Sequence, residues 1–415
     1  MTAVVGDGNT GGHAADARLG GRTAERGGAV RSGAEVSRRL RDFRAPDASS
    51  GLLLAIIVVL NLFGLVMVLS ASSVTALADR VDPTTYFERQ LLGLGLGLVA
   101  FVVTSRIHYS YWARFARIGL AVAYALLFAV LAIGVEVGGS TRWIDVGPLR
   151  FQPSEFAKLA IILFIADLLA SRESHVGDIR RSLNPVLVFF APMALLVFTE
   201  PDLGTTIILT VIVMAMVFVA GVPLRPMFVV GGLGVGLAAA AAVAQPYRVR
   251  RLVAVTDPWS DPTGTGWQTL QSLTGLANGG LDGVGLGQSR VKWGYLPNSH
   301  TDFIFAIIGE EMGLIGTLGV LLAVAFLGLL GIRTALRATD LFGQLLAAGI
   351  TTWFLFQAFV NIGGVVGLLP ITGVTLPFVS FGASSLVVTM AAAGLLLNVS
   401  RDAAAADAAR RRLDQ

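Results

Sequence analysis

Residues 51–73 read GLLLAIIVVLNLFGLVMVLSASS, an apolar run without a single charged side chain. A helix needs about 20 apolar residues to cross the hydrocarbon core of a bilayer. Stretches that reach or approach this length recur at about residues 51–73, 89–105, 117–136, 155–171, 186–199, 203–221, 226–244, 303–332, 341–368 and 374–399. The sequence therefore predicts an all-α, polytopic membrane protein with about ten transmembrane helices.

The composition fits solvation by lipid rather than by water. Of the 415 residues, 54% are hydrophobic and 14% are charged, and the mean hydropathy is +0.72. A soluble enzyme of this size needs a more polar surface. The chain has no cysteine, which excludes disulfides and thiolate sites. It also lacks a Walker-type loop and a His cluster, which argues against nucleotide-driven transport and zinc hydrolysis.

Arginines alternate with the predicted spans in a way that indicates the topology. If the N-terminus is cytoplasmic, every even-numbered loop and the C-terminal tail carry arginine, as the positive-inside rule requires. These residues are Arg106, Arg114, Arg117, Arg172, Arg180, Arg181, Arg225, Arg333, Arg337 and Arg401. The excess of positive charge therefore indicates membrane topology, not a nucleic-acid partner. We predict a disordered, Arg-rich cytoplasmic tail at 1–50, a ten-helix domain at 51–400 and a cytoplasmic tail at 401–415.

The longest predicted loop, residues 245–302, lies outside the cytoplasm and precedes the eighth helix. Within it an apolar side chain recurs every three residues, at Trp267, Leu270, Leu273 and Leu276. This spacing predicts a helix. The helix could lie in the membrane interface or pack on the bundle, and the pattern fits both equally.

Glu155 and Lys158 are three residues apart at the start of the fourth predicted span, so they share one face of a helix. Charged side chains at such a depth are costly and tend to face protein or a cavity. The pair is equally compatible with a structural ion pair and with the polar wall of a substrate cavity.

Asp302 lies where the long loop turns into the eighth span, in the segment Asn298-Ser299-His300-Thr301-Asp302-Phe303. Partial desolvation would raise the pKa of its carboxyl, while Arg290 or Lys292 nearby would lower it, so Asp302 could act as a general base. On local sequence alone a helix cap is the simpler role. Glu310 and Glu311 follow two turns deeper, and at least one of them must face protein or water.

Cationic side chains are also predicted at the outer face. They are Arg142, which precedes Trp143, and the trio Arg248, Arg250 and Arg251 in the long loop. The guanidinium group matches phosphate oxygens, so these residues suit the diphosphate of a lipid headgroup. Ordinary contact with anionic membrane lipids is the alternative.

Several motifs, spread in order from about residue 55 to 400, carry a resemblance to a known family. They are Gly64-Leu65-Val66-Met67-Val68-Leu69-Ser70-Ala71-Ser72, Arg142-Trp143-Ile144 through Gln152-Pro153-Ser154-Glu155 to Lys158, Pro201-Asp202-Leu203-Gly204-Thr205, Asp257-Pro258-Trp259, Asp261-Pro262, Gly285-Leu286-Gly287-Gln288-Ser289, His300-Thr301-Asp302-Phe303-Ile304-Phe305, and Gly367-Leu368-Leu369-Pro370 through Leu376-Pro377-Phe378 to Ser384-Ser385. Together they resemble the SEDS family (shape, elongation, division and sporulation), whose members include FtsW and RodA.

This resemblance implies a peptidoglycan glycosyltransferase with both termini in the cytoplasm, which polymerises lipid II into β-1,4 glycan strands on the outer leaflet. Asp302 maps onto the family's catalytic aspartate. The substrate-binding residues we then expect are Glu155, Lys158, Arg142, Arg248, Arg251, Lys292, His300, Ser384 and Ser385. No cofactor is certain, and a divalent cation, Mg or Mn, at Asp302 is left open.

The resemblance also implies partners and a location. We expect lipid II, the lipid-linked glycan strand, membrane lipids, a class B penicillin-binding protein (an FtsI-like transpeptidase) and other division proteins, in the plasma membrane at the division septum. The long N-terminal tail and the segments Asn361-Ile362-Gly363 and Leu369-Pro370-Ile371-Thr372-Gly373 look more like an actinobacterial FtsW than a RodA. A RodA-type lateral-wall polymerase, a lipid II flippase and a non-enzymatic division scaffold are the alternatives.

Overall fold

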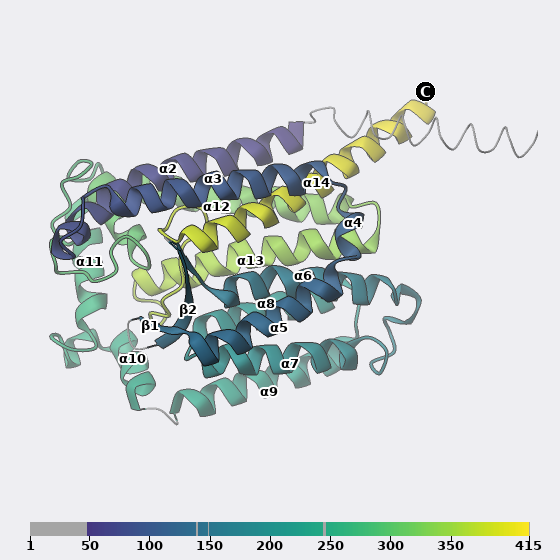
Figure 1. Cartoon of the computed structure of the whole chain (residues 1–415), viewed down its shortest axis with the longest axis horizontal. Coiled ribbons are helices and arrows are strands. Elements are labelled where there is room, and N and C mark those ends of the chain that lie inside the picture. The colour runs from purple at the N-terminus through teal and green to yellow at the C-terminus, as the bar shows by residue number, and fades with distance from the viewer. Residues whose placement is uncertain (1–47, 138–139, 148, 244–245, 415) are drawn as a thin grey trace, which may run out of the picture.

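The computed structural model describes residues 48–137, 140–147, 149–243 and 246–414, which form a bundle of roughly parallel helices (Figure 1). The predicted N-terminal tail therefore falls almost entirely outside the described residues. Six described helices are long and apolar enough to cross a membrane. They are α2 (Ala48–Ala78), α3 (Thr85–Arg106), α5 (Ala116–Ile133), α12 (Ile304–Arg337), α13 (Leu341–Val365) and α14 (Ala383–Leu413).

Four further helices coincide with the other predicted spans. Three are apolar, namely α7 (Leu183–Thr199), α8 (Leu203–Val219) and α9 (Leu224–Val243). The fourth, α6 (Pro153–Ala170), contains Glu155, Lys158 and Asp167. The predicted helical membrane fold is confirmed, and each predicted apolar stretch contains a helix; the number of helices that cross the bilayer stays a prediction.

The two ends of the bundle differ. One end, which we call the loop end, carries β1 (Val135–Val137), β2 (Ser140–Val146), β3 (Leu149–Phe151), α10 (Pro246–Thr256), η2 (Pro258–Ser260) and α11 (Trp267–Gly279). At the opposite end, the tail end, lie α4 (Ser110–Ala113) and the last turns of α14, which project beyond the bundle (Figure 1). A further 3-10 turn, η1 (Glu173–His175), connects α6 and α7.

The three short strands form an antiparallel sheet in the order β1-β2-β3, which the sequence analysis did not predict. β2 reads STRWIDV, and its aromatic and β-branched residues favour an extended backbone. The sheet connects α5 to α6 along the chain, and on β2 the side chain of Arg142 reaches the turn between α7 and α8.

α11 packs on the bundle and is not detached from it. Its small residues Thr269, Ser272, Gly275 and Gly279 are buried, and a Cβ on Gly279 would lie 1.9 Å from the Gly309 carbonyl oxygen of α12. The predicted apolar stripe, Trp267 to Leu276, is partly buried beside this small-residue face. Of the two readings of this helix, the structure favours packing on the bundle.

Two predicted spans have different boundaries in the structure. The tenth was expected to start at 374, but α14 begins at Ala383, because residues 366–382 contain two prolines and Gly373, whose φ of +74° is left-handed. The eighth is interrupted at Gly313, with φ +64°. At this break the backbone carbonyls of α12 accept hydrogen bonds from the loop that follows α11. Val284 N–H donates to the Glu310 carbonyl (2.9 Å) and Gly285 N–H to the Glu311 carbonyl (3.0 Å).

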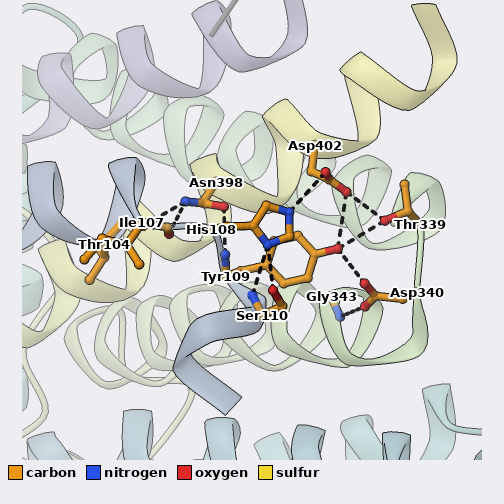
Figure 2. Close-up of polar contacts among 10 residues, drawn as sticks. All are labelled: Thr104, Ile107, His108, Tyr109, Ser110, Thr339, Asp340, Gly343, Asn398 and Asp402. Atoms are coloured by element: carbon orange, nitrogen blue, oxygen red, sulfur yellow. Dashed lines mark hydrogen bonds and ion pairs between the residues drawn. The ribbon is translucent and has the colours of Figure 1, made fainter. Parts of the chain in front are cut away.

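Polar side chains fasten three elements together at the tail end (Figure 2). The Tyr109 hydroxyl lies 2.7 Å from Asp340 Oδ2 and 3.2 Å from Asp402 Oδ2, and Thr339 Oγ1 donates to the same Asp402 oxygen at 2.7 Å. Asn398 Nδ2 on α14 donates to the Ile107 carbonyl at 2.6 Å. This cluster joins the α3–α4 turn, the α12–α13 turn and α14.

Candidate active site

Asp302 lies at the loop end, immediately before α12. The N-cap of α12 is Phe303, not Asp302, and the structure records no side-chain capping hydrogen bond at this position, so the simpler role considered for Asp302, a helix cap, is wrong. The backbone around Asp302 is nevertheless fixed. Asn361 Nδ2 donates to the Asp302 carbonyl at 2.8 Å and to the Val374 carbonyl at 2.7 Å, and Ser380 Oγ donates to the Thr301 carbonyl at 2.6 Å.

The side chain of Asp302 is only partly exposed and lines a small pocket between α13 and the segment 371–374. Burial raises the pKa of its carboxyl to about 6, and the nearby guanidinium groups of Arg142 and Arg251 limit this rise. The carboxyl is therefore mostly ionised at neutral pH and can still accept a proton. The cations expected beside it were Arg290 and Lys292; that expectation is wrong, because Arg142 and Arg251 are the cations that act on it.

Arg142 is oriented by the turn between α7 and α8. Its Nε donates to the Glu200 carbonyl at 3.1 Å, its Nη2 donates to the Pro201 carbonyl, and its Nη1 lies 3.7 Å from Asp202 Oδ1. Asp202 is itself fixed, because it caps α8 by accepting the Thr205 N–H at 3.0 Å. The guanidinium is thereby held in one orientation near Asp302.

A cavity of about 370 Å³ opens between α10 and α11, next to this site. Its polar lining consists of Arg250, Arg251, Asp261, Thr265, Gln268 and Thr269. Ile371 lines both this cavity and the pocket at Asp302, and its carbonyl accepts a hydrogen bond of 3.2 Å from Arg251 Nη1. Arg248 lies on α10, but its side chain is outside the described part of the chain.

Glu155 and Lys158 form a buried network inside the bundle. Lys158 Nζ lies 2.6 Å from both Glu155 Oε1 and Gln357 Oε1, and Ser385 Oγ donates to Glu155 Oε2 at 2.7 Å. Lys158 is fully buried and lies 4.8 Å from the ring centroid of Trp353. The network joins α6, α13 and α14. Substrate contact by these residues and by the neighbouring Ser384, which is also buried, stays a prediction.

Lys292 and His300 also lie in the interior, away from the Asp302 carboxyl. Lys292 Nζ pairs with Glu311 Oε1 at 2.9 Å, and Ser70 Oγ donates to the same carboxylate. The His300 ring packs against Tyr86, with centroids 4.8 Å apart. Burial lowers the pKa of His300 to about 4, so this ring is neutral at physiological pH. Both residues precede Asp302 in the chain and hold the loop that leads to it, and substrate contact by either of them stays a prediction.

Several residues of this site had no role assigned from the sequence. Asp202 was quoted only as part of a motif, and Glu200, Asn361 and Gly373 were not singled out for any chemistry. A cap residue directly after a proline, in Pro201-Asp202, is a local signal for Asp202. The other three act through contacts with distant segments, for which the sequence gives no local signal.

A divalent cation at Asp302 stays a prediction. Among the described residues no group of three or more His, Asp or Glu side chains is placed to hold a metal ion. Two arginines act on Asp302 and would repel such an ion. We therefore derive no step through a metal.

A model of the cell cycle protein family FtsW/RodA/SpoVE matches residues 51–405. The chain belongs to this family. It is 42% identical over 356 residues to the stage V sporulation protein E of Bacillus subtilis, and the matched region covers 85% of this chain and 97% of that protein. It is 40% identical over 340 residues to a probable peptidoglycan glycosyltransferase FtsW of Escherichia coli, covering 81% of this chain and 82% of the relative.

Solved structures of the family agree with the fold. A chain from a peptidoglycan synthase complex superposes with a TM-score of 0.69 at 31% identity, covering 85% of this chain and 97% of that chain. The rod shape determining protein RodA of Thermus thermophilus superposes with a TM-score of 0.63 at 29% identity, covering 84% and 96%. The predicted family is confirmed; the narrower assignment to an actinobacterial FtsW stays a prediction.

Proposed function

We propose that the protein is a peptidoglycan glycosyltransferase that polymerises lipid II into β-1,4 glycan strands during septal wall synthesis. The observation that carries this proposal is the partly desolvated Asp302 carboxyl held beside two arginines, next to a polar cavity. The name of the Escherichia coli relative supports the reaction class. A general base and a diphosphate-binding cation are the two groups that this transfer needs.

The transfer needs one proton acceptor and one leaving group. Asp302 takes the proton from the 4-hydroxyl of the acceptor GlcNAc, and that oxygen forms a bond with the anomeric carbon of the donor MurNAc. The bond from this carbon to the diphosphate oxygen breaks, and undecaprenyl diphosphate leaves with the electron pair. Because attack occurs opposite an α-linked diphosphate, the new bond is β. Arg142 and Arg251 offset the charge that develops on the leaving group.

The proposed orientation places the loop end on the outer leaflet and both termini in the cytoplasm. Arginine in the connections at the tail end supports it; examples are Arg114, Arg181 and Arg337. The substrate headgroup would then enter between α10 and α11, where Arg250 and Arg251 line the cavity. The lipid tail would remain in the bilayer beside the bundle.

The proposed partner is a class B penicillin-binding protein that crosslinks the new strands. In its favour, the 31% identical neighbour belongs to a peptidoglycan synthase complex that coordinates polymerization and crosslinking. Other division proteins would bind the tails. The septal role follows the FtsW relatives.

The test is polymerisation of purified lipid II by the purified protein, with and without its cognate penicillin-binding protein. Wild type should form polymer, Asp302→Ala should form none, and Asp282→Ala, which removes an exposed carboxylate from the same loop, should behave as wild type. A parallel assay follows movement of labelled lipid II across vesicles. If wild type forms no polymer and Asp302→Ala still moves lipid II across the membrane, the protein is a flippase and the polymerase proposal is wrong.

A further inference from the structure

Glu200 is a buried carboxyl group that the proposed reaction does not use. It lies at the C-terminal end of α7, and none of its surface is exposed. Neither carboxyl oxygen has a hydrogen-bond partner among the described residues. An ionised carboxylate without a partner is far more costly to bury than a neutral acid.

Arg142 approaches Glu200 but does not pair with its side chain. Arg142 Nε donates to the backbone carbonyl of Glu200 at 3.1 Å, and Nη1 lies 3.7 Å from Asp202 Oδ1. An ionised Glu200 would attract the guanidinium strongly at this depth, because charges interact more strongly where water is excluded. The observed arrangement, in which Arg142 pairs with Asp202 instead, therefore fits a neutral Glu200.

Three acidic side chains thus compete for one guanidinium. The charge of Arg142 opposes the rise in the pKa of Glu200 and of Asp302, and its guanidinium group is paired with Asp202. The charged groups that face Glu200 are Asp202 at the start of α8 and Arg142 on β2. The other titratable side chains on helices packed against α7 are Glu155, Lys158 and Asp167 on α6 and Arg117 and Tyr124 on α5. α7 itself has none between Leu183 and Thr199.

We propose that Glu200 is a positioning residue that stays a neutral acid in the active enzyme and, when it ionises, draws Arg142 away from Asp302 and the diphosphate. The proton that Glu200 loses goes to solvent, and polymerisation falls. In support, burial, together with repulsion by Asp202, raises the pKa of Glu200 to about 8, although Arg142 opposes the shift. This inference rests on the proposed function, because it explains why the rate of the same polymerisation reaction falls at high pH.

The test compares the pH profile of lipid II polymerisation in wild type, Glu200→Gln and Glu200→Met. Both variants keep a neutral side chain at every pH. Wild-type activity should fall by about tenfold per pH unit above pH 8, as expected for loss of one required proton, and both variants should lose this decline. The matched control is Glu136→Gln, which neutralises an exposed carboxylate on β1 and should decline as wild type does.

A second readout does not depend on activity. The infrared spectrum of the wild-type protein should lose one protonated carboxyl band between pH 7 and pH 9, and the two Glu200 variants should show no such loss. A decline unchanged in the variants, a folded but inactive Glu200→Gln, or no titrating carboxyl band in wild type would each overturn the proposal. If no protein forms polymer at any pH, the proposed function fails, whereas the infrared band still decides the protonation of Glu200.

Discussion

Asp302 and Arg142 approach each other across Gly373. A Cβ atom on Gly373 would lie 3.6 Å from Asp302 Oδ2 and 3.9 Å from Arg142 Nη1. The carboxylate and the guanidinium come from segments 160 residues apart in the chain (302 minus 142), and Gly373, whose left-handed φ of +74° favours glycine, lies beside both of them. The missing side chain leaves a gap beside both groups, and we predict that a substrate oxygen enters it.

Asp302→Asn should reduce polymerisation by about 10²–10⁴-fold, the usual contribution of a general base. In wild type, activity should rise as pH increases through about 6, because the base must be ionised. Initial rates measured across this range check both statements. Asp282→Asn is the control, and a variant at Asp302 that keeps wild-type rates would contradict the assigned role.

The same pKa has a consequence for stability. The folded pKa of Asp302 is raised above its ordinary value of 3.8, so the folded protein binds this proton more tightly than the unfolded chain. Its contribution to stability is present at low pH and is lost as pH rises through about 6. Asp302→Asn should therefore raise Tm at pH 7.5 more than at pH 5. An equal change in Tm at both pH values would show that the carboxyl is not desolvated.

Gly373→Ala should destabilise the fold by about 1–2 kcal/mol, because its φ of +74° is unfavourable for an L-residue. It should also slow polymerisation, since the new methyl group stands between Asp302 and Arg142. Gly147→Ala is the matched control: its φ is +60°, and a Cβ there meets nothing within 4 Å. Equal activity in the two variants, at equal Tm, would mean that the gap is not used by substrate.

Lys158→Met should cost about 3–5 kcal/mol, because it leaves the buried Glu155 charge without its partner. Adding Glu155→Gln removes that charge and should restore much of the Tm. The rate of the double variant then separates the two readings of this pair. Recovery of polymerisation together with Tm indicates a structural ion pair, whereas recovery of Tm alone indicates contact with substrate.

Lys292→Met should likewise destabilise the protein by about 3–5 kcal/mol, since Glu311 is buried and paired with it. Because this pair fastens the loop that leads to Asp302, limited proteolysis should cut residues 280–292 faster in the variant. Arg290→Met changes an exposed cation in the same loop and should stay within about 0.5 kcal/mol of wild type. Unchanged proteolysis in Lys292→Met would show that other contacts hold the loop.

Tyr109→Phe should cost about 1–3 kcal/mol, the usual effect of leaving buried polar groups unsatisfied. The lost hydroxyl contacts Asp340, Thr339 and Asp402 at the tail end (Figure 2). Tm should fall while the rate per folded molecule stays unchanged, because the cluster lies at the opposite end from Asp302. If the polymerisation rate of Tyr109→Phe falls while its Tm is unchanged, the tail end influences the site at the loop end, and the assigned structural role is wrong.

Local sequence patterns determined most of the fold. Apolar stretches predicted every long helix because a lipid environment requires about 20 apolar residues per span and internal hydrogen bonding of the backbone. Where the pattern failed, a backbone effect was responsible. Gly313 interrupts α12 and Pro377 delays the start of α14, although both lie in otherwise apolar stretches.

The candidate site was predicted only in part. Asp302 and Arg142 were recognised as chemically suitable residues, and the family resemblance singled out Asp302. The cations beside Asp302 were misassigned. Lys292 is only ten residues away in the chain, but it forms an ion pair with Glu311 instead. Sequence distance is a poor guide here, because helices that cross a membrane bring together residues from separate loops.

The sequence by itself determined that this chain is a lipid-solvated helical bundle with an unusual set of charges near one end, because hydropathy and charge placement are properties of the residues themselves. Only the tertiary structure decided which charges meet. Arg142 on the β2 strand lies near Asp302, and at the same place the carboxyl group of Glu200 has no hydrogen-bond partner among the residues that the structure describes. Pairing and desolvation depend on distances between segments, and those distances exist only once the helices have packed.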